Sequence, residues 1–293
     1  MKIAVNTPTG NIGRRLVRHL LDGGDDDVVL LVRDAGKLTG LPAGRVTVHE
    51  GSLEDAAFVS AATRGVDALF WVTPPRPDGD DLHAFQNRMG QHVAAAVTDN
   101  DIARVVHVSS VGAQHSGGTG PIKGLHDVER LLGGTGASVT HLRAAFFMEN
   151  YLMQAASIRE HGAVFMPIAP EVRVEMIATA DIAAKTARIL RGKIWTGEQV
   201  VELAGPRPHT FGEAAALIGK ALNHPVEHVA TDPEQTRTAL RSLGFRDPII
   251  DLYLEMYDGL ERGLLAFEGP VQRTGTTLTD FATEVLAPAV RHG

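Results

Sequence analysis

Two glycines near the start of the chain have the spacing that binds a dinucleotide pyrophosphate. Gly10 lies in a tight turn after the apolar run Ile3–Val5, and Gly13 follows three residues later, where a helical pattern begins. A helix N-terminus presents free backbone N–H groups and the positive end of its dipole, which together attract phosphate. Gly10 would let the backbone approach the phosphates, and Gly13 would let the helix pack against the strand. The turn therefore predicts a dinucleotide site.

The other residues of this turn belong to the same predicted site. Asn11 and Ile12 lie between the two glycines, and we expect them and Thr7 to contact the cofactor. Thr7 stands where the usual G-x-x-G-x-x-G spacing has its first glycine, so the turn departs from that pattern at one position. The turn follows a strand and precedes a helix, which is the context that gives a short glycine motif its meaning.

The end of the second apolar run bears on the choice of cofactor. Arg33 follows the run Val28–Val32 and lies 20 positions after Gly13, where a dinucleotide fold places the residue that selects the adenosine ribose. An acidic residue there favours NAD(H), whereas a guanidinium group matches a 2′-phosphate. Lys37, four residues further on, adds a second positive charge. We therefore predict NADP(H), against the alternative that Arg33 only closes a strand at the surface.

Segments that follow the other strands complete the expected cofactor site. In a parallel α/β sheet the ligand lies at the carboxyl ends of the strands. Ser52 and Leu53 follow the third strand and could meet the adenine, and Ser52 could equally cap the next helix. The remaining predicted cofactor contacts are Val72, Thr73, Pro74, Ser109 and Phe146.

Polar side chains near the expected nicotinamide position are candidates for catalysis. Ser110 ends the fifth strand beside Ser109, and either serine could hydrogen-bond a substrate carbonyl or cap the loop. His126 could donate a proton or hold the nicotinamide ribose. Glu129 lies three residues later on the same helical pattern, so the alternative is a surface histidine that pairs with Glu129.

A third catalytic candidate, Tyr151, follows the sixth strand. We expect it to be the only tyrosine near the site, because Tyr253 and Tyr257 lie far along the chain. An apolar wall and an amide beside it are predicted to bind the substrate, with ordinary core packing as the alternative for the apolar residues. The predicted substrate contacts are Phe147, Met148 and Asn150.

Strands and helices alternate through the first two thirds of the chain, and this alternation predicts a doubly wound parallel α/β sheet. After the first strand, the predicted strands are Val28–Val32, Val46–His49, Ala68–Thr73, Val105–Ser109, Val139–Arg143 and Gln199–Leu203. The predicted helices between them are Ile12–Leu21, Glu54–Thr63, Leu82–Asn100 and Ile122–Leu132. Right-handed crossovers would then bring the candidate residues to one edge of the sheet.

The last third of the chain lacks this alternation and predicts a smaller, mainly helical lobe over the cofactor face. Its helical patterns are Asp181–Leu190, Phe211–Leu222, Pro233–Leu243 and Pro248–Leu265. We assign residues 1–150 to a cofactor-binding domain, to which 176–205 return. Residues 151–175 and 206–276 would form the substrate lobe, and 277–293 a C-terminal segment.

The composition is that of an ordinary globular protein. The chain has 293 residues, of which 44% are hydrophobic and 22% charged, with no cysteine and a net charge of -7. These values exclude disulfides and argue against a nucleic-acid surface. No apolar run is long enough for a membrane span, and the chain has no cysteine ligands, so we expect no membrane contact and no metal. A strand begins at Lys2, from which we expect no signal peptide and a cytoplasmic location.

Several motifs along the chain carry a resemblance to a known family. They are Asn11–Gly13, Leu31–Asp34, Val108–Ala113, Glu129, Leu142–Asn150 and Thr277–Phe281. Together they resemble the NmrA-like branch of the atypical short-chain dehydrogenases/reductases, and the Phe-Met-Glu-Asn stretch is the most specific of them. The resemblance implies a Rossmann fold that binds NADP(H), with a C-terminal substrate lobe. Its members include quinone reductases, ketoreductases and regulators that sense the cofactor without catalysis.

The resemblance also implies that a usual catalytic pair is missing. Standard short-chain reductases use a Tyr-x-x-x-Lys pair, and those positions here are Pro121 and Leu125. Neither side chain can donate a proton, so an acceptor whose product anion is already delocalised is favoured. We therefore predict an NADPH-dependent reductase of a quinone or an aromatic polyketide ketone, which could form a homodimer. The alternatives are a non-catalytic NADP(H) sensor acting on a protein partner and, less favoured, an isomerase or epimerase.

Overall fold

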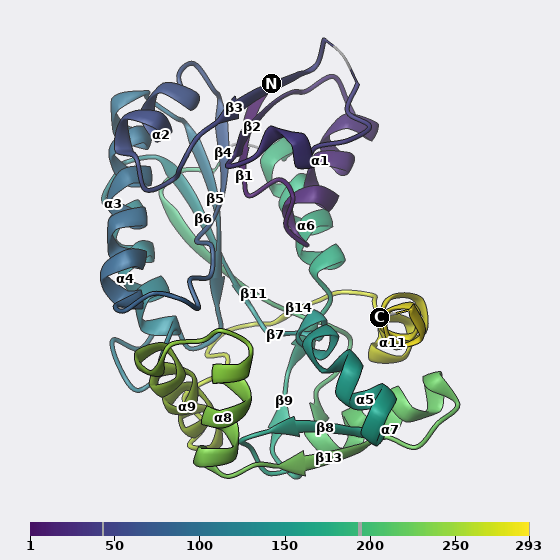
Figure 1. Cartoon of the computed structure of the whole chain (residues 1–293). Coiled ribbons are helices and arrows are strands. Elements are labelled where there is room, and N and C mark those ends of the chain that lie inside the picture. The colour runs from purple at the N-terminus through teal and green to yellow at the C-terminus, as the bar shows by residue number, and fades with distance from the viewer. Residues whose placement is uncertain (43, 193–194, 293) are drawn as a thin grey trace.

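The computed structural model describes residues 1–42, 44–192 and 195–292, and its centre is one eight-stranded sheet (Figure 1). The strand order is β14-β11-β6-β5-β4-β1-β2-β3, and every neighbouring pair is parallel. The strands of this sheet are β1 (Lys2–Asn6), β2 (Asp27–Val32), β3 (Val46–Glu50), β4 (Ala68–Val72), β5 (Arg104–Ser110), β6 (Ser138–Ala144), β11 (Glu198–Ala204) and β14 (Gln272–Arg273). The doubly wound parallel sheet predicted from the sequence is confirmed.

Helices cover both faces of the sheet, as Figure 1 shows. On one face lie α1 (Gly13–Asp22) and α6 (Thr179–Arg191), and on the other lie α2 (Ala56–Ala62), α3 (Leu82–Asp99) and α4 (Ile122–Gly133). Alternation along β4 explains the two layers, because Phe70 packs with the core under α1 whereas Leu69 and Trp71 pack with the core under α3. All three side chains are fully buried. The short helix η1 (Ala35–Lys37) follows β2.

A second, smaller part of the molecule lies beyond the carboxyl ends of the strands (Figure 1). Its helices are η2 (Met148–Gln154), α5 (Ala155–His161), α7 (Phe211–Leu222), α8 (Pro233–Ser242), α9 (Asp247–Glu261), α10 (Leu278–Phe281), η3 (Ala282–Leu286) and α11 (Ala287–His292). Its strands are β7 (Phe146–Phe147), β8 (Ala163–Met166), β9 (Arg173–Val174), β10 (Met176–Ile177), β12 (His209–Thr210) and β13 (Glu227–Ala230). These strands pair two by two. The sequence did not predict them, because two to four residues are too few to show a period.

The boundaries between the two parts follow the chain less simply than the predicted ranges. Residues Gln272–Arg273 form β14, which extends the main sheet beside β11, although they fall within the range 206–276 assigned to the lobe. Residues of α10, η3 and α11 pack in the core of the lobe, where Phe281 is 2% exposed. Gly293, the last residue of the predicted C-terminal segment, lies outside the described residues. None of the helices in the described part of the chain is both long and apolar enough to span a bilayer.

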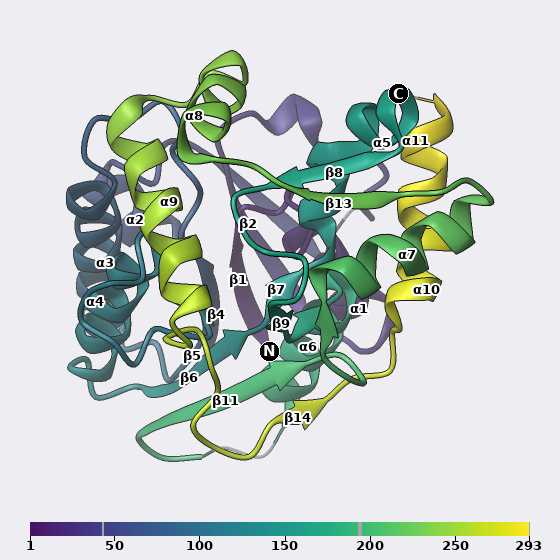
Figure 2. The same ribbon diagram turned by 90° about the horizontal axis from the view of Figure 1, so that it is seen from below.

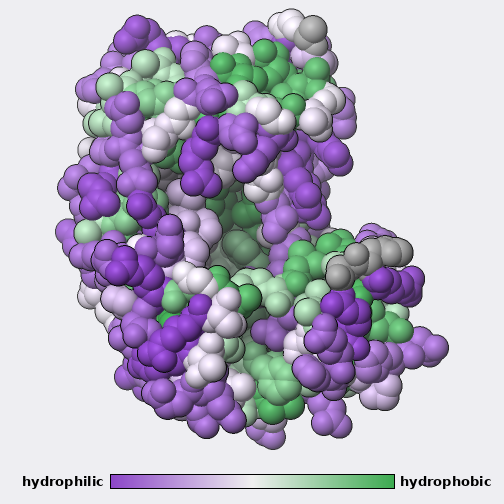
Figure 3. Space-filling model, in the orientation of Figure 1, coloured by the Kyte–Doolittle hydropathy of each residue, from purple (hydrophilic) through white to green (hydrophobic). Residues whose placement is uncertain are grey.

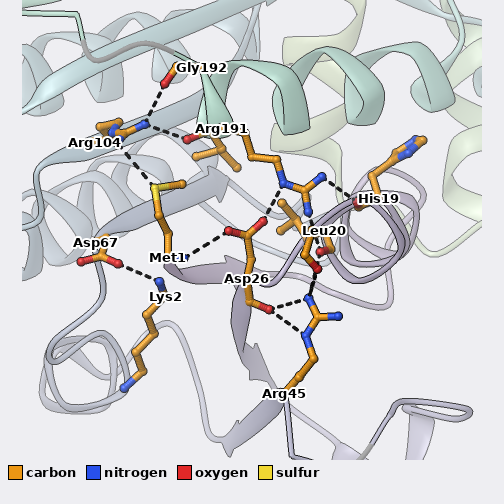
Figure 4. Close-up of polar contacts among 12 residues, drawn as sticks. Met1, Lys2, His19, Leu20, Asp26, Arg45, Asp67, Arg104, Arg191 and Gly192 are labelled. Atoms are coloured by element: carbon orange, nitrogen blue, oxygen red, sulfur yellow. Dashed lines mark hydrogen bonds and ion pairs between the residues drawn. The ribbon is translucent and has the colours of Figure 1, made fainter.

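Three arginines stabilise the edge of the sheet opposite the lobe (Figure 4). Arg191 donates to the carbonyl of Leu20 near the end of α1 (2.6 Å) and forms an ion pair with Asp26 (2.6 Å). Arg45 donates to the carbonyl of Gly24 beyond the same helix end (2.5 Å). Arg104 donates to the carbonyl of Leu190 at the end of α6 (2.8 Å). Cations at helix C-termini satisfy carbonyls that lack an intrahelical partner. These arginines therefore connect the ends of α1 and α6 to the sheet.

Candidate cofactor and substrate site

The turn between β1 and α1 leaves its helix N-terminus free for a ligand. Residue Ile12 occupies the N-cap of α1 and supplies no capping side chain. A hydrogen bond from Gly10 N to Thr7 O (3.0 Å) closes the turn. A Cβ on Gly13 would lie 2.2 Å from Thr7 O, so only glycine fits there. The structure thus refines the role predicted for Gly13, whose missing side chain makes room for the backbone of the turn itself.

Thr7 adopts the conformation that glycine usually supplies at the first position of this turn. Its φ is 48°, in the left-handed region that β-branched residues rarely occupy. The left-handed backbone turns the Thr7 carbonyl toward Gly10, with which it forms the hydrogen bond above. The departure from the glycine pattern therefore changes the residue type and leaves the turn conformation in place, at a cost in local strain.

Asn6 was not predicted as a site residue, although it shapes the crevice. Its side chain is fully buried and forms two hydrogen bonds with the backbone of Val72, from Nδ2 to the carbonyl (2.8 Å) and from the amide N to Oδ1 (2.9 Å). The β1–β4 ladder ends at the pair Val5 and Phe70, so the Asn6 amide takes the place of its next step. Asn6 thus lies between β1 and β4, at the point where the strand order reverses, and doubly wound folds bind ligands at this point. The predicted contacts Val72, Thr73 and Pro74 lie at the same point.

The predicted 2′-phosphate residues lie together at the end of β2. Arg33 is exposed and makes no ion pair within the described part of the chain. The carboxylate of Asp34 instead turns to the following residues, where it accepts from Gly36 N (3.0 Å) and lies 3.8 Å from Lys37 Nζ. Glu50 at the end of β3 fixes the same turn by accepting from Ala35 N (3.0 Å). Arg33 is thus left as the cation free to meet a ligand at this strand end.

The alternative role considered for Ser52 is wrong. The N-cap of α2 is Asp55, whose carboxylate accepts from the backbone N–H of Ala57 (2.9 Å) and of Phe58 (3.3 Å). Ser52 Oγ accepts only from Glu54 N (3.2 Å), within the turn that precedes the helix. Ser52 and its neighbour Leu53 follow β3 at the carboxyl edge of the sheet, on the same side as Arg33.

The catalytic candidates on β5 and α4 have defined partners. Ser110 Oγ donates to the carbonyl of Val111 (3.0 Å), whereas Ser109 Oγ is buried with no partner among the described residues. Nδ1 of His126 lies 2.8 Å from the carbonyl of Ala113. A carbonyl only accepts, so Nδ1 carries the proton, and Nε2 of the neutral ring is an acceptor. His126 could therefore donate a proton to a substrate only as an imidazolium ion.

The surface pairing considered for His126 and Glu129 is also wrong. Glu129 is 4% exposed and forms a two-point ion pair with Arg143 of β6, with distances of 3.1 and 2.7 Å. Burial favours such a fork-to-carboxylate pair over a single contact with histidine. Glu129 thus ties α4 to β6, and His126 is left with the loop after β5 as its partner.

The stretch after β6 lies on the seam between the two parts of the molecule. Phe147 packs against the core of the sheet, and Phe146 packs against the core of the lobe. Asn150 is exposed, whereas Met148 is 1% exposed and lies in the core of the lobe. The burial of Met148 favours the alternative of ordinary core packing for this residue.

Tyr151 lies in the same core and is fully buried. Its ring packs edge-on against Phe146, with 6.1 Å between ring centroids, and its hydroxyl has no partner among the described residues. Burial, followed by the charge of Tyr257, raises the pKa of the Tyr151 phenol. Tyr257 packs against the same core, so the expectation that Tyr151 is the only tyrosine near the site is wrong. The spacing of Tyr253 and Tyr257 puts both on one side of a helix, but sequence alone cannot bring that helix to residue 151.

A buried network that the sequence did not reveal connects the phosphate turn to the Phe-Met-Glu-Asn stretch. Glu149 caps α6, because its carboxylate accepts from the N–H (3.0 Å) and from the hydroxyl of Thr179. Arg15 on α1 donates to the same hydroxyl (3.3 Å) and to the carbonyl of Asn11 (2.9 Å) in the phosphate turn. Burial lowers the pKa of the Arg15 guanidinium. Glu149 thereby explains why an acid follows Met148 in this motif.

A hollow separates the sheet from the lobe on the face seen in Figure 3, with apolar atoms at its floor and polar side chains around its rim. Figure 2, viewed from the side of the lobe, shows α9 and the paired strands β8 and β13 in front of the carboxyl ends of the sheet strands. An apolar floor with a few polar groups suits a flat organic ligand. The phosphate turn and the ends of β4, β5 and β6 lie on the sheet side of this hollow.

Comparisons with known proteins agree with this arrangement. A profile of the NmrA-like family matches residues 1–257. The chain is 32% identical over 249 residues to an NAD(P)H azoreductase of Xenophilus azovorans, covering 85% of this chain and 84% of that protein. It is 28% identical over 295 residues to quinone oxidoreductase 2 of Escherichia coli, covering 99% and 98%.

Two solved structures share the fold. An NADPH-dependent quinone oxidoreductase from Escherichia coli has a TM-score of 0.78 at 24% identity, covering 97% of this chain and 99% of that chain. A triphenylmethane reductase from Citrobacter, solved with NADP(H), has a TM-score of 0.77 at 20% identity, covering 99% of both chains. The family profile and the azoreductase relative each cover most of the chain, and we conclude that the protein is a member of the NmrA-like family.

Proposed function

We propose that this protein is an NADPH-dependent reductase that transfers hydride to a conjugated carbonyl compound such as a quinone or an aromatic polyketide ketone. The observation that carries the proposal is a dinucleotide turn, which departs from the glycine pattern only at Thr7, together with a missing Tyr-x-x-x-Lys pair. At the positions of the usual Tyr-x-x-x-Lys pair, Pro121 occupies the N-cap of α4, and Leu125 lies within that helix.

The residues present fit NADPH. The uncapped N-terminus of α1 and the turn from Thr7 to Gly13 would hold the pyrophosphate, because their N–H groups and the helix dipole attract its charge. Arg33 would hold the 2′-phosphate, with Lys37 nearby as a second cation. We further propose Ser52, Leu53 and the turn after β4 as contacts to the adenosine half. When bound, NADPH supplies the hydride, and this chain positions the cofactor and the acceptor relative to each other.

The chemistry of the acceptor follows from the missing acid. Hydride addition to a simple ketone gives an alkoxide that needs a proton at once, whereas a quinone gives an anion spread over an aromatic ring. Such an acceptor needs mainly orientation against the nicotinamide. The apolar hollow between sheet and lobe suits a flat molecule of this kind. The names of the relatives support a conjugated acceptor more generally, since they are reductases of azo compounds, quinones and triphenylmethane dyes, and only the quinones among these are carbonyl compounds.

The test is to follow NADPH absorbance with a panel of quinones, azo compounds and aromatic polyketide ketones. We expect oxidation of NADPH with at least one of them. If the purified protein binds NADPH but oxidises it with none, the reductase proposal fails, and the alternative of a non-catalytic cofactor sensor is supported. A homodimer is also part of the proposal, and light scattering after size exclusion measures it.

A variant separates the cofactor assignment from the acceptor. Arg33→Ala removes the cation proposed for the 2′-phosphate, and the loss of a charge-assisted contact of about 1.5–3 kcal/mol weakens NADPH binding about 10- to 100-fold. The affinity for NADH should change little. Equal losses for the two cofactors would contradict the choice of NADP(H).

A further inference from the structure

Helix α9 carries a second tyrosine, Tyr257, which packs against the core that contains Tyr151, and α9 is in close contact with the loop after β5. A Cβ on Gly120 of that loop would lie 1.9 Å from Leu252 O, and a Cβ on Gly259 would lie 2.4 Å from Gly118 O. The backbones of the loop and of α9 are therefore in direct contact at both ends of the segment that carries Tyr257. Any motion of α9 would have to move this part of the loop with it.

Tyr257 also lies close to the stretch that follows β6. Its side chain packs against the core of the lobe, in the cluster that contains Tyr151 and also contacts Phe146. Phe146 lies two residues after the end of β6 and packs edge-on against Tyr151. Tyr257 thus lies on a helix that contacts the loop after β5 and in a cluster with the stretch after β6, and these two strands flank the expected position of the nicotinamide ring.

The phenol of Tyr257 differs from that of its neighbour in one decisive respect. Tyr151 is fully buried, so no ligand reaches its hydroxyl without movement of the core. Tyr257 is partly exposed, and its hydroxyl makes no hydrogen bond to the residues that the structure describes. It is therefore a donor with nothing to bind in the absence of a ligand.

We propose that the Tyr257 hydroxyl donates the hydrogen bond that holds the carbonyl oxygen of the acceptor, in place of the acid that this chain lacks. The inference rests on the proposed reductase function and names the group that binds its substrate. The buried ring of Tyr151 would then pack against the ring of Tyr257 and limit its movement.

The phenol acts as a hydrogen-bond donor and keeps its own proton. Burial, followed by the charge of Tyr253, raises the pKa of Tyr257, so the phenol stays neutral throughout the range in which the enzyme would be assayed. Addition of hydride to a quinone places two electrons and one hydrogen on the acceptor and leaves a hydroquinone anion. The hydrogen bond stabilises the negative oxygen, and the second proton comes from water. The products are hydroquinone and oxidised cofactor.

The test compares Tyr257→Phe with Tyr253→Phe. The control tyrosine lies one turn earlier on α9 and packs edge-on against Phe245, with 5.5 Å between ring centroids, in the core on the α3 side of the sheet. We expect Tyr257→Phe to lower kcat/KM for a quinone about 10- to 100-fold, the range for one lost hydrogen bond to a charged oxygen. NADPH affinity and Tm should stay at wild-type values, and Tyr253→Phe should match the wild type in all three measurements.

A binding measurement keeps the inference testable even if the reductase proposal fails. Menadione is titrated against protein saturated with NADP⁺, which prevents turnover, and tryptophan fluorescence reports binding. We expect a dissociation constant about tenfold weaker for Tyr257→Phe than for the wild type. Unchanged menadione binding and unchanged kcat/KM would overturn the inference. A parallel fall in Tm and NADPH affinity would also overturn it, because it would assign Tyr257 a structural role.

Discussion

Replacing each glycine of the phosphate turn by alanine should affect different properties of the protein, namely stability for Gly13 and NADPH affinity for Gly10. Both face the same atom, the carbonyl oxygen of Thr7. A Cβ on Gly13 would lie 2.2 Å from it, and a Cβ on Gly10 would lie 3.3 Å from it. The first distance is about 1 Å too short for any contact, so the turn and the start of α1 must move apart. The second needs an adjustment of only a few tenths of an ångström, and Gly10 has no positive φ.

The expected magnitudes follow from this difference. Overpacking of this kind costs about 1–3 kcal/mol, so Gly13→Ala should lower the free energy of unfolding by that amount and Tm by about 2–4 °C per kcal/mol. Gly10→Ala should be within about 1 kcal/mol of the wild type, because restriction of the unfolded chain offsets the tighter contact. Its defect should appear in NADPH binding, which we expect to weaken tenfold or more as the methyl group keeps the phosphates from the backbone.

The assays are urea denaturation followed by circular dichroism and titration of NADPH fluorescence on the same preparations. Gly13→Ala should lose both stability and affinity, whereas Gly10→Ala should lose affinity alone. A Gly13→Ala protein as stable as the wild type would refute the steric argument. A Gly10→Ala protein with wild-type NADPH affinity would refute the assignment of Gly10 to the phosphates.

Three further predictions concern buried polar groups and strain. His107 and His141 lie in contact in the sheet (Nδ1 to Nδ1, 3.1 Å), and burial lowers the pKa of both below that in the unfolded chain. The contribution of this pair to stability is therefore complete above about pH 6.5 and is lost as the pH drops through the folded pKa values, by about 1.4 kcal/mol per unit of pKa depression. His107→Leu should reduce this loss in urea titrations at several pH values. Glu149→Ala removes the cap of α6 at Thr179 and should cost about 0.5–2 kcal/mol in thermal denaturation, with Glu149→Gln less affected. Thr7→Gly relieves a left-handed residue worth about 1–2 kcal/mol, offset in part by unfolded-state entropy, so urea denaturation should show equal or slightly higher stability, and a clear loss would contradict the strain.

Much of the fold could be predicted because its signals are local. Apolar runs of five to seven residues mark β1 to β6 and β11, and the observed ends lie within one residue of most predictions. The phosphate turn and Arg33 are equally local, since one strand, one turn and one helix position them. By contrast, β14 and the strands of the lobe have two to four residues, and only tertiary pairing makes them strands.

The parts of the site that escaped prediction are those that need contact between distant segments. Glu129 has a histidine on its own helix, and the sequence cannot show that Arg143 on another strand offers a better partner. Glu149 belongs to a sequence motif, but its role as the cap of α6 follows only from its contact with Thr179, which lies 30 residues later in the chain. Local spacing thus predicts the cofactor contacts, whereas the side chains that we propose for the substrate depend on how the lobe packs on the sheet.

Different elements should determine the cofactor affinity and the acceptor specificity of this protein. The proposed cofactor half consists of β1, α1 and β2, whose backbone geometry leaves little freedom, as the space around Gly13 shows. The proposed acceptor half consists of α9 and the stretch after β6, whose side chains pack together in the core of the lobe. A neutral phenol on α9 demands less of its substrate than a true acid does, because it needs only an oxygen that becomes more negative during the reaction. Substitutions along α9 that face the hollow should therefore change which conjugated acceptor is reduced and leave NADPH affinity unchanged. Competition between a quinone and an azo compound in one assay would measure that change directly.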